Sequence, residues 1–407
     1  MKLNLKHIVS IRKNLIKICK YFPDRSTGSE TNRRAGEFIM RQFDFAGWNT
    51  RKQEFDALDW QENGARLSVN GSEFIAFPSP YSRGCNTEAE LISVSSISEL
   101  ERAKIRGKLV LLHNEIAAEQ LMPKSFKFYN PEQHQHIISL LERGAPQAII
   151  CATGRNAAAA GGVYPFPLIE DGDFNIPSVY MTEEQGKNLL NYLGQPVNII
   201  SDCKRIPGKG FNVVAEKGPS KAERIVITAH YDAKKGTPGA IDNATGVVIL
   251  LLLAGLLTDY HGKYCIELAA FNGEDYYSVP GQMLYLRENQ ERFGDILLNI
   301  NIDGAGYKEG PSAYSFYELP NEIKAKAEGI FAEFCGLTSG DQWVQGDHSI
   351  FVQNGCPAIA FSSQWFIEHI DTQTITHTPA DNPDIVEPAK CVEIAEAMAE
   401  LITELGT

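Results

Sequence analysis

The sequence predicts an α/β protein that also contains a second, smaller unit, and three observations support this prediction. From residue 211 onward, strand-like apolar runs alternate with longer helical patterns, as in a sheet that helices cover. Between residues 58 and 202 the strand-like runs are shorter and are interrupted by Gly, Asn and Ser. Polar residues of the kind that bind metals follow most of the later strand-like runs.

The part of the chain after "FNVVAEKG" carries the clearest alternation. Strands are expected at 224–229, 264–271, 296–302 and 358–362, and helices at 244–257, 281–293, 322–335 and 388–405. This order predicts a largely parallel sheet.

The first residues predict two amphipathic helices and a strand. Apolar residues recur at helical spacing from Ile8 to Ile18, and a second helical pattern covers 30–45 after the capping turn "DRSTGSE". The segment "WNTRKQEFDA" at 48–57 then reads as a short strand.

The smaller unit is expected to mix strands and helices. Strands are expected at "GARLSVNGSEFIAF", "AELISV", "GKLVLLH" and "QAIICA", a helix at "QHIISLLERGA", and a strand followed by a helix at "IPSVYMTEEQGKNLLNYL". His134 and His136 form an HxH, which we expect to lie in a polar loop rather than to bind a metal.

Composition excludes several classes of partner. The chain has 407 residues, 43% of them hydrophobic, and a net charge of −13. This charge argues against nucleic acid and anionic membranes, because both attract basic surfaces. Interleaved charges in "MKLNLKHIVSIRKNLIKICKYF" argue against a signal peptide, and the longest apolar run, 247–257, is too short to span a bilayer. We therefore expect a cytoplasmic protein, whose oligomeric state the sequence does not predict.

The eight cysteines occur singly and form no CxxC pair, which gives a thiolate zinc site little support. We expect reduced and mostly buried thiols. They are Cys19, Cys85, Cys151, Cys203, Cys265, Cys335, Cys356 and Cys391.

Ligand-type side chains follow the predicted strands from residue 224 onward. They are His230 and Asp232, then Glu274 and Asp275, then Asp303 and, after a longer loop, His377. Asp242 lies in the glycine-containing segment between the first strand and its helix. Because the crevice of an open α/β sheet lies beyond the carboxyl ends of its strands, these residues can converge.

Two histidines and three aspartates are the donors that a pair of zinc-like ions needs. Three aspartate ligands and one bridging hydroxide would neutralise two divalent cations. Without metal, the same carboxylates would repel one another at a cost of several kcal/mol. Glu274 is the additional carboxylate, free to take a proton from a water molecule.

The motifs resemble those of the co-catalytic zinc aminopeptidases, whose superfamily includes bacterial leucyl aminopeptidases, glutamate carboxypeptidase and glutaminyl cyclase. The resemblance is carried by "HYD…GAIDNATG", "FNGED", "NIDGAG", "GDHSIF" and "THTPAD" in this order, with weaker agreement at "DRSTGSETNRRAGEFI". It implies a three-layer αβα sandwich around a mixed, mostly parallel sheet. The catalytic domain would then be discontinuous, with residues 1–57 and 207–407.

Residues 58–206 resemble an inserted protease-associated domain, a small β-rich module found in some members of this family. The segments "KLVLL", "GAPQAIICA" and "IPSVYMTEEQGKNLL" follow its usual order.

The same resemblance implies a role for each site residue. Asp242 would bridge two metals, His230 and Asp303 would hold one ion, and Asp275 and His377 would hold the other. Glu274 would act as general base and then general acid. Asp232 would hydrogen-bond the other ring nitrogen of His230 and so orient the ring.

Three positions depart from the family pattern. The second-metal carboxylate is often Glu, whereas here it is the shorter Asp275. Some members have Tyr before the final His, where this chain has Thr376, and Ser often stands where this chain has Gln282. Asp347 and His348 lie in the motif "GDHSIF", whose residues do not bind metal in the family. Asp242 could also serve as the N-cap of the helix that follows it.

We therefore expect an aminopeptidase that hydrolyses the N-terminal residue of peptides with a free N-terminus, with two divalent ions, foremost zinc. A carboxypeptidase or dipeptidase acting on acidic peptides would need a cluster of Arg, and residues 207–407 contain few. The sequence also leaves open a single-zinc enzyme like glutaminyl cyclase and a catalytically inactive binding module of the same fold.

Overall fold

The computed structural model describes residues 4–127, 129–156, 160–219 and 223–407. The chain divides into two compact units, one made of Met1–Ala57 with Lys209–Thr407 and the other of Leu58–Gly208. The long strands β1 (Asn49–Val69) and β8 (Pro196–Lys217) contribute residues to both units.

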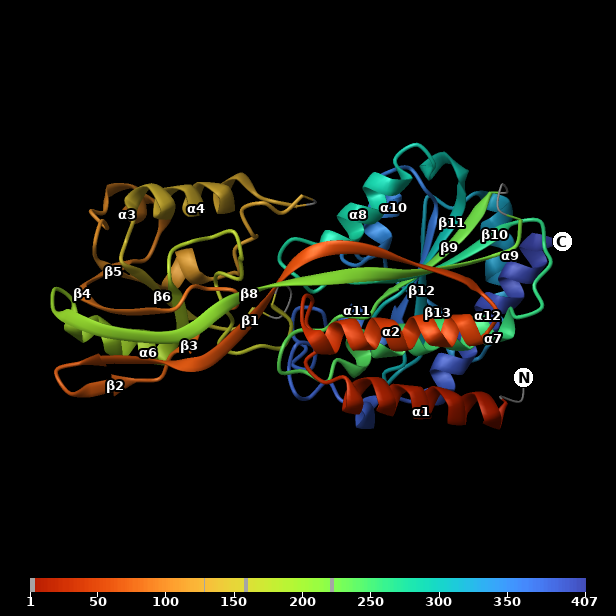
Figure 1. Ribbon diagram of the computed structural model, residues 1–407, viewed down its shortest axis with the longest axis horizontal. Coiled ribbons are helices and arrows are strands. Elements are labelled where there is room, and N and C mark those ends of the chain that lie inside the picture. Colours follow the sequence, from red (N-terminus) through yellow and green to blue (C-terminus); the bar gives the residue numbers. More distant parts are fainter. Residues whose placement is uncertain (1–3, 128, 157–159, 220–222) are drawn as a thin grey trace. The chain divides into compact units, whose positions relative to one another are not determined.

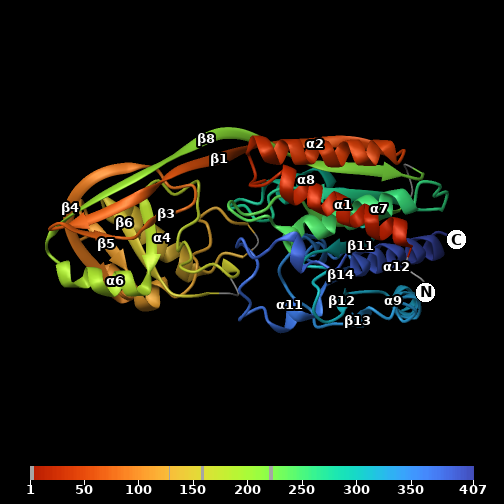
Figure 2. The ribbon, with the colours of Figure 1, turned by 90° about the horizontal axis from the view of Figure 1, so that it is seen from below.

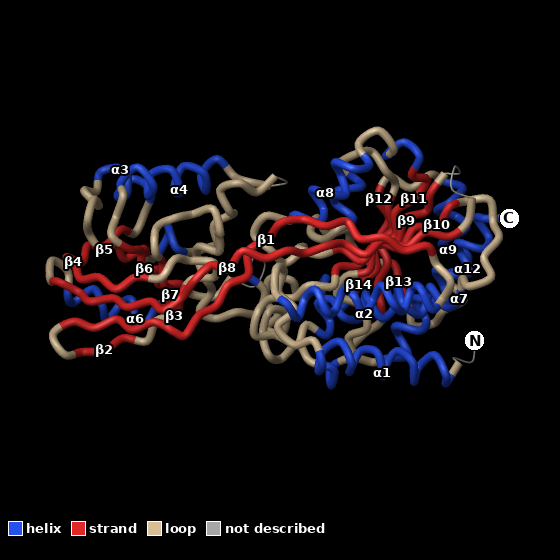
Figure 3. Tube along the Cα trace, in the orientation of Figure 1, coloured by secondary structure: helices blue, strands red, loops and turns tan. Residues whose placement is uncertain are grey.

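The larger unit is built on a sheet with the strand order β13-β12-β14-β11-β9-β10-β8 (Figures 1 and 3). Its other strands are β9 (Arg224–His230), β10 (Cys265–Phe271), β11 (Ile296–Ile302), β12 (Ser312–Tyr317), β13 (Leu337–Ser339) and β14 (Ala358–Ser363). Strands β14, β11, β9 and β10 pair in parallel, whereas β12 pairs with β14 and β8 with β10 in the antiparallel direction. The sheet is therefore mixed and mostly parallel, as the sequence predicts.

The register brings the carboxyl ends of the central strands to one edge. His230 at the end of β9 lies opposite Phe271 at the end of β10, and Thr228 lies opposite Asn301 near the end of β11. Every residue of β9 and β10 is buried, which explains their near-continuous apolar sequence. Residues that follow these three strands therefore start from neighbouring points.

Helices cover both faces of this sheet and make three layers (Figures 1 and 2). One face carries α1 (Leu5–Tyr21), α2 (Glu30–Phe45), α7 (Thr245–Leu256), α9 (Asn321–Phe331) and α12 (Pro388–Gly406), whose apolar residues join those of the sheet in one large core. The opposite face carries α8 (Pro280–Asn289) and the short α10 (His348–Val352). A further short helix is α11 (Gln364–Glu368).

Helix α7 follows the segment that carries Asp242 and is buried on several sides. It contacts β9 and β10 as well as α1, α2 and α12. Val247, Val248, Ile249 and Leu250 are each at most 1% exposed, so this run of apolar residues has no solvent-facing side. Each such side chain contributes about 1.5 to 3 kcal/mol of burial free energy, which fixes the helix beside the site.

The described residues of the smaller unit form further strands of the same hydrogen-bonded order and apolar cores on both faces of these strands. Strands β4 (Cys85–Val94), β5 (Leu109–Leu112), β6 (Ala148–Thr153) and β7 (Ser178–Thr182) pair in parallel, and β3 (Phe77–Pro78) and β8 flank them in the antiparallel direction. Helices α3 (Ile97–Arg102) and α4 (Glu132–Gly144) pack on one face and α6 (Glu183–Leu189) on the other. The short β2 (Ser72–Phe74) pairs with β1.

Several expected elements differ from the structure. The expected short strand at 48–57 is the first part of β1, which continues without a break to Val69 and pairs with β8 and β2. His134 and His136 lie on α4 and not in a polar loop, since Ile137, Ile138 and Leu141 anchor the helix to the core. Strands β12 and β13 have no counterpart among the predicted elements.

The helix start near Asp242 also differs. Helix α7 begins at Thr245, and Asp242 has non-helical φ and ψ angles. Asn243 performs the capping instead, because its Oδ1 accepts a hydrogen bond from the Gly246 amide at 3.0 Å.

Among the described residues, no helix has both the length and the apolar character that crossing a bilayer requires.

Candidate metal centre

The predicted ligands all belong to the larger unit and lie beyond the carboxyl ends of its strands. His230 is the last residue of β9, and Asp303 directly follows β11. Asp275 lies in the turn after β10, Asp242 in the loop before α7, and His377 in the loop after α11. Five residues from five segments thus meet in two groups.

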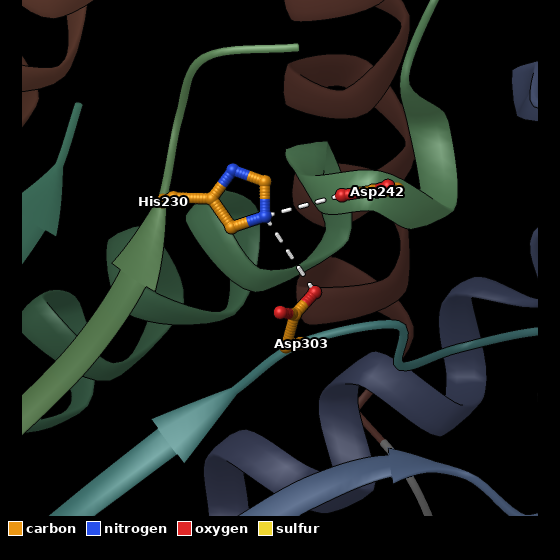
Figure 4. Close-up of side chains that lie close together, drawn as sticks. All are labelled: His230, Asp242 and Asp303. Carbon is orange, nitrogen blue, oxygen red and sulfur yellow. Dashed lines mark ion pairs between the residues drawn. The ribbon is translucent and has the colours of Figure 1, made fainter. Parts of the chain in front are cut away.

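The first group consists of His230, Asp242 and Asp303 (Figure 4). The Nε2 atom of His230 lies 3.1 Å from Oδ1 of Asp242 and 3.6 Å from Oδ1 of Asp303. Figure 4 shows both carboxylates directed toward this nitrogen, so that one cation could contact all three side chains.

The second group consists of Asp242, Asp275 and His377. The Nε2 atom of His377 lies 3.0 Å from Oδ2 of Asp242 and 3.0 Å from Oδ1 of Asp275. Asp242 therefore faces His230 with one carboxylate oxygen and His377 with the other. This is the arrangement that a bridging ligand between two cations requires.

The donor set fits a metal better than it fits a network of hydrogen bonds. The side chain of His230 is 1% exposed, yet neither of its ring nitrogens has a hydrogen-bond partner of suitable geometry among the described residues. The buried Oδ2 atom of Asp275 also has none. Buried polar atoms are nearly always paired, so unpaired donor atoms that converge on a point indicate a site for a cation.

The pKa values of the two histidines point the same way. Burial alone would lower the pKa of His230, but Asp303, Asp232 and Asp242 outweigh it and raise this pKa well above its ordinary value. Burial is likewise outweighed at His377, whose pKa Asp275 and Asp242 raise. The carboxylates therefore create a demand for positive charge, which protons or divalent cations can meet.

Glu274 is a member of neither ligand group and directly precedes Asp275. Burial raises the pKa of its carboxyl group well above the ordinary value, and the nearby Asp275 and Asp303 add to the rise. A carboxyl group with a raised pKa, held beside a metal centre, is suited to accept and return a proton.

Asp232 contacts both the ring of His230 and the backbone of the turn that carries Asp275. Its Oδ1 atom lies 3.6 Å from Nδ1 of His230, which is an ion-pair distance rather than a hydrogen bond. Its carboxylate instead accepts hydrogen bonds from the amides of Gly273 at 2.7 Å, Glu274 at 3.3 Å and Asp275 at 3.1 Å. One buried carboxylate thus orients the turn that carries both Glu274 and a ligand.

Asp381 is a buried carboxylate that sequence reasoning missed. It accepts hydrogen bonds from the amides of Ile241 at 2.6 Å and Asp242 at 3.1 Å, and so holds the backbone of the shared ligand. Burial and the nearby Asp242 raise the pKa of Asp381 to about 7. The sequence offered one indication of its role: Asp381 is the last residue of the motif "THTPAD", which also contains His377.

The remaining residues of the motifs have partners outside the ligand groups. Asp347 accepts a hydrogen bond from Nε2 of Gln282 at 2.6 Å, and Nε2 of His348 donates to the carbonyl of Trp343 at 3.0 Å. Thr376 accepts a hydrogen bond from Gln373 at 2.6 Å. The unusual Gln282 therefore pairs with the Asp of "GDHSIF".

Comparison with known proteins gives a family and a fold. Residues 212–402 match the model of peptidase family M28. Leucine aminopeptidase 2 from Trichophyton equinum is 23% identical over 394 residues, which cover 88% of this chain and 72% of that protein.

Two solved structures share the fold. An aminopeptidase from Aneurinibacillus sp. strain AM-1 aligns with a TM-score of 0.75 and 18% identity over 97% of this chain and 93% of its own. A zinc aminopeptidase from Bacillus subtilis aligns with a TM-score of 0.74 and 17% identity over 100% of this chain and 96% of its own. These comparisons confirm the resemblance to the co-catalytic zinc aminopeptidases: residues 212–402 match peptidase family M28, and the similar proteins support a hydrolase of the metallopeptidase class.

Proposed function

We propose that this metallopeptidase is an aminopeptidase that removes the N-terminal residue of peptides with a free N-terminus, with two divalent ions, foremost zinc. The observation that carries the proposal is Asp242, whose two carboxylate oxygens lie 3.1 Å and 3.0 Å from two different histidines. His230 and Asp303 would complete one ion position, and Asp275 and His377 the other. The names of the similar proteins, aminopeptidases and a zinc aminopeptidase, support the same reaction and metal.

The residues divide the chemical work as follows. When bound, the two ions would polarise the scissile carbonyl and make the attacking water more acidic. Glu274 would take the proton from that water and then give it to the departing amine. Asp232 would keep Glu274 and Asp275 in place through its bonds to their amides.

The competing functions have less support. Recognition of acidic peptides would need arginines near the centre, but Arg224 begins β9 at the end opposite His230 and pairs with Glu267 at 3.0 Å. A single-zinc centre would leave one of the two ligand groups without a purpose. An inactive binding module would not need all five ligands and a free Glu274.

We further propose that residues 58–206 are a protease-associated-like domain. The support is a compact unit whose described residues form apolar cores separate from that of the larger unit, in addition to the motif order in the sequence.

The test of the proposed function is Glu274→Gln, assayed on a panel of aminoacyl-p-nitroanilides and their N-acetylated counterparts. We expect the parent to hydrolyse only the substrates with a free amine, and a chelator to abolish the activity. The variant should lose about 10²- to 10⁴-fold in kcat, because the general base is removed. Its metal content should match that of the parent, since Glu274 belongs to neither ligand group.

The matched control is Glu288→Gln. Glu288 lies on α8, pairs with Gln53 and Arg51, and belongs to neither ligand group. This control should keep the activity of the parent. Normal turnover by Glu274→Gln would refute the assigned proton transfer, and a parent without bound metal would refute the proposed reaction.

A further inference from the structure

The motif "DRSTGSE" near the start of the chain contains an arginine with an unusual environment. Arg25 is 0% exposed. Its guanidinium donates hydrogen bonds to three backbone carbonyls: Nε to Tyr231 at 2.8 Å, Nη1 to Pro238 at 2.6 Å and Nη2 to Gly239 at 2.5 Å. All three acceptors lie in the loop between the ligands His230 and Asp242.

This loop has little regular structure of its own. No helix or strand covers the residues between β9 and Ala240, and Gly236 and Gly239 adopt left-handed φ angles of 83° and 56°. The guanidinium packs so closely that a Cβ atom on Gly239 would lie 2.7 Å from its Nη2 atom. The loop and the arginine therefore fit each other closely.

The segment around Arg25 contacts the loop at further points. Asp24 accepts a hydrogen bond from the Gly236 amide at 2.7 Å, and Thr27 donates to Asp232 at 3.2 Å. At the far end of the loop, Asp381 accepts from the amides of Ile241 and Asp242. The guanidinium binds carbonyls and the carboxylate binds amides, so the loop is held from both of its ends.

We propose that Arg25 is a positioning residue that fixes the loop between His230 and Asp242 and thereby sets the affinity of the first metal position. The inference rests on the proposed function only in that the bound group is a metal ion. A lysine could not replace Arg25, because the rigid fork of a guanidinium reaches three carbonyls at once, whereas an ammonium is a single point of charge.

The test compares Arg25→Lys with Arg224→Lys. Arg224 is a suitable control because its side chain is also buried, with 1% exposed, and also donates to a backbone carbonyl. It lies at the end of β9 opposite His230. Zinc affinity is measured by competition with a chromophoric chelator, and the Co²⁺-loaded proteins are compared by their visible absorption spectra. Unfolding in urea gives the stability of each protein.

We expect both variants to lose stability, but only Arg25→Lys to bind one metal equivalent about 10- to 100-fold more weakly and to change the Co²⁺ spectrum. Equal zinc affinity in the parent and Arg25→Lys would overturn the proposal, as would an equal loss in both variants.

Amide hydrogen exchange of the metal-free parent decides the matter if Arg25→Lys does not fold. Because Arg25 and Asp381 rather than the metal would hold the loop, the amides of Ile241 and Asp242 should exchange slowly without metal. Exchange of these amides at the rate of an unfolded chain would overturn the proposal. A parent that binds no metal would refute the proposed function instead, and this exchange experiment would still test whether the protein itself holds the loop without metal.

Discussion

At the scale of the residue, the two ligand groups depend unequally on their members, because Asp242 alone belongs to both. Asp303 and Asp275 each belong to a single group, together with His230 and His377 respectively. The loss of one aspartate should therefore remove either one metal position or both, depending on which aspartate is changed.

We expect Asp242→Ala to abolish binding of both ions, whereas Asp303→Ala and Asp275→Ala should each retain about one ion per chain, since one complete group remains. Metal analysis by mass spectrometry after exhaustive dialysis measures this directly. A full complement of metal in Asp242→Ala would exclude a bridging role.

A second residue-scale prediction concerns the buried His348. Its Nε2 donates to the Trp343 carbonyl and its Nδ1 accepts from Asn301 at 3.4 Å, so both nitrogens are satisfied in the neutral ring. Burial lowers its pKa to about 4, against an ordinary value of 6.5. The unfolded chain therefore takes up a proton below pH 6.5 that the folded chain refuses, and stability falls as the pH drops from 6.5 toward 4.

Between pH 7 and pH 5 this one group should reduce the free energy of unfolding by about 2 kcal/mol. Urea titrations of the parent and of His348→Gln at both pH values test the effect. The two proteins should differ less in stability at pH 5 than at pH 7, and an equal difference at both would contradict the prediction.

The residue scale also shows what sequence reasoning can find. Ligand-type side chains at the ends of buried strands could be predicted, since parallel strands bring their carboxyl ends together. The roles of Arg25 and Asp381 could not, although both residues lie in motifs quoted above, because their partners are backbone carbonyls and amides, which leave no pattern of side chains in the sequence. Their partners are set by the path of a loop and not by residue type.

At the scale of the element, the loop between β9 and α7 contains two glycines in similar conformations but different surroundings. A Cβ atom at Gly239 would lie 2.6 Å from the Asp242 carbonyl and 2.7 Å from Ala233, whereas nothing lies within 4 Å of one at Gly236. The two positions therefore separate the cost of backbone conformation from the cost of lost space.

Gly236→Ala should cost about 1 to 2 kcal/mol, the strain of a left-handed residue with a side chain. Gly239→Ala should cost more and also weaken metal binding, because the loop must move away from Arg25. Thermal unfolding and zinc titration of both variants test this pair. Equal effects of the two changes would show that the close packing at Gly239 is unimportant.

The elements were predicted unequally well. Strands β9, β10, β11 and β14 and helices α2 and α12 are recognisable because their apolar runs or stripes are long. Strand β12, "SAYSFY", alternates polar and apolar residues over a short stretch and lies toward the edge of the sheet. β13 has only three residues, fewer than a periodic pattern needs.

At the scale of the whole molecule, the two units have separate apolar cores. The large core of the first unit contains no residue of the second, and the two cores of the second contain none of the first. All five predicted ligands lie in the first unit. Metal should therefore stabilise only one of two regions.

We expect scanning calorimetry to resolve two transitions, of which only one moves to higher temperature when zinc is added. At a free zinc concentration of one hundred times the dissociation constant, the gain in stability is about 2.7 kcal/mol. Asp242→Ala, which should lack the effect, is the control. A shift of both transitions by the same amount would show that the units unfold together.

The contacts of Arg25 can form only after more than half of the chain has been synthesised. Arg25 leaves the ribosome 206 residues before Tyr231, the nearest in sequence of the three carbonyl partners that it requires. His377 is synthesised later still, so the second ligand group remains incomplete for most of the synthesis of the chain. Capture of two metals would therefore be a late event in biogenesis, which must follow the emergence of the segment that carries His377.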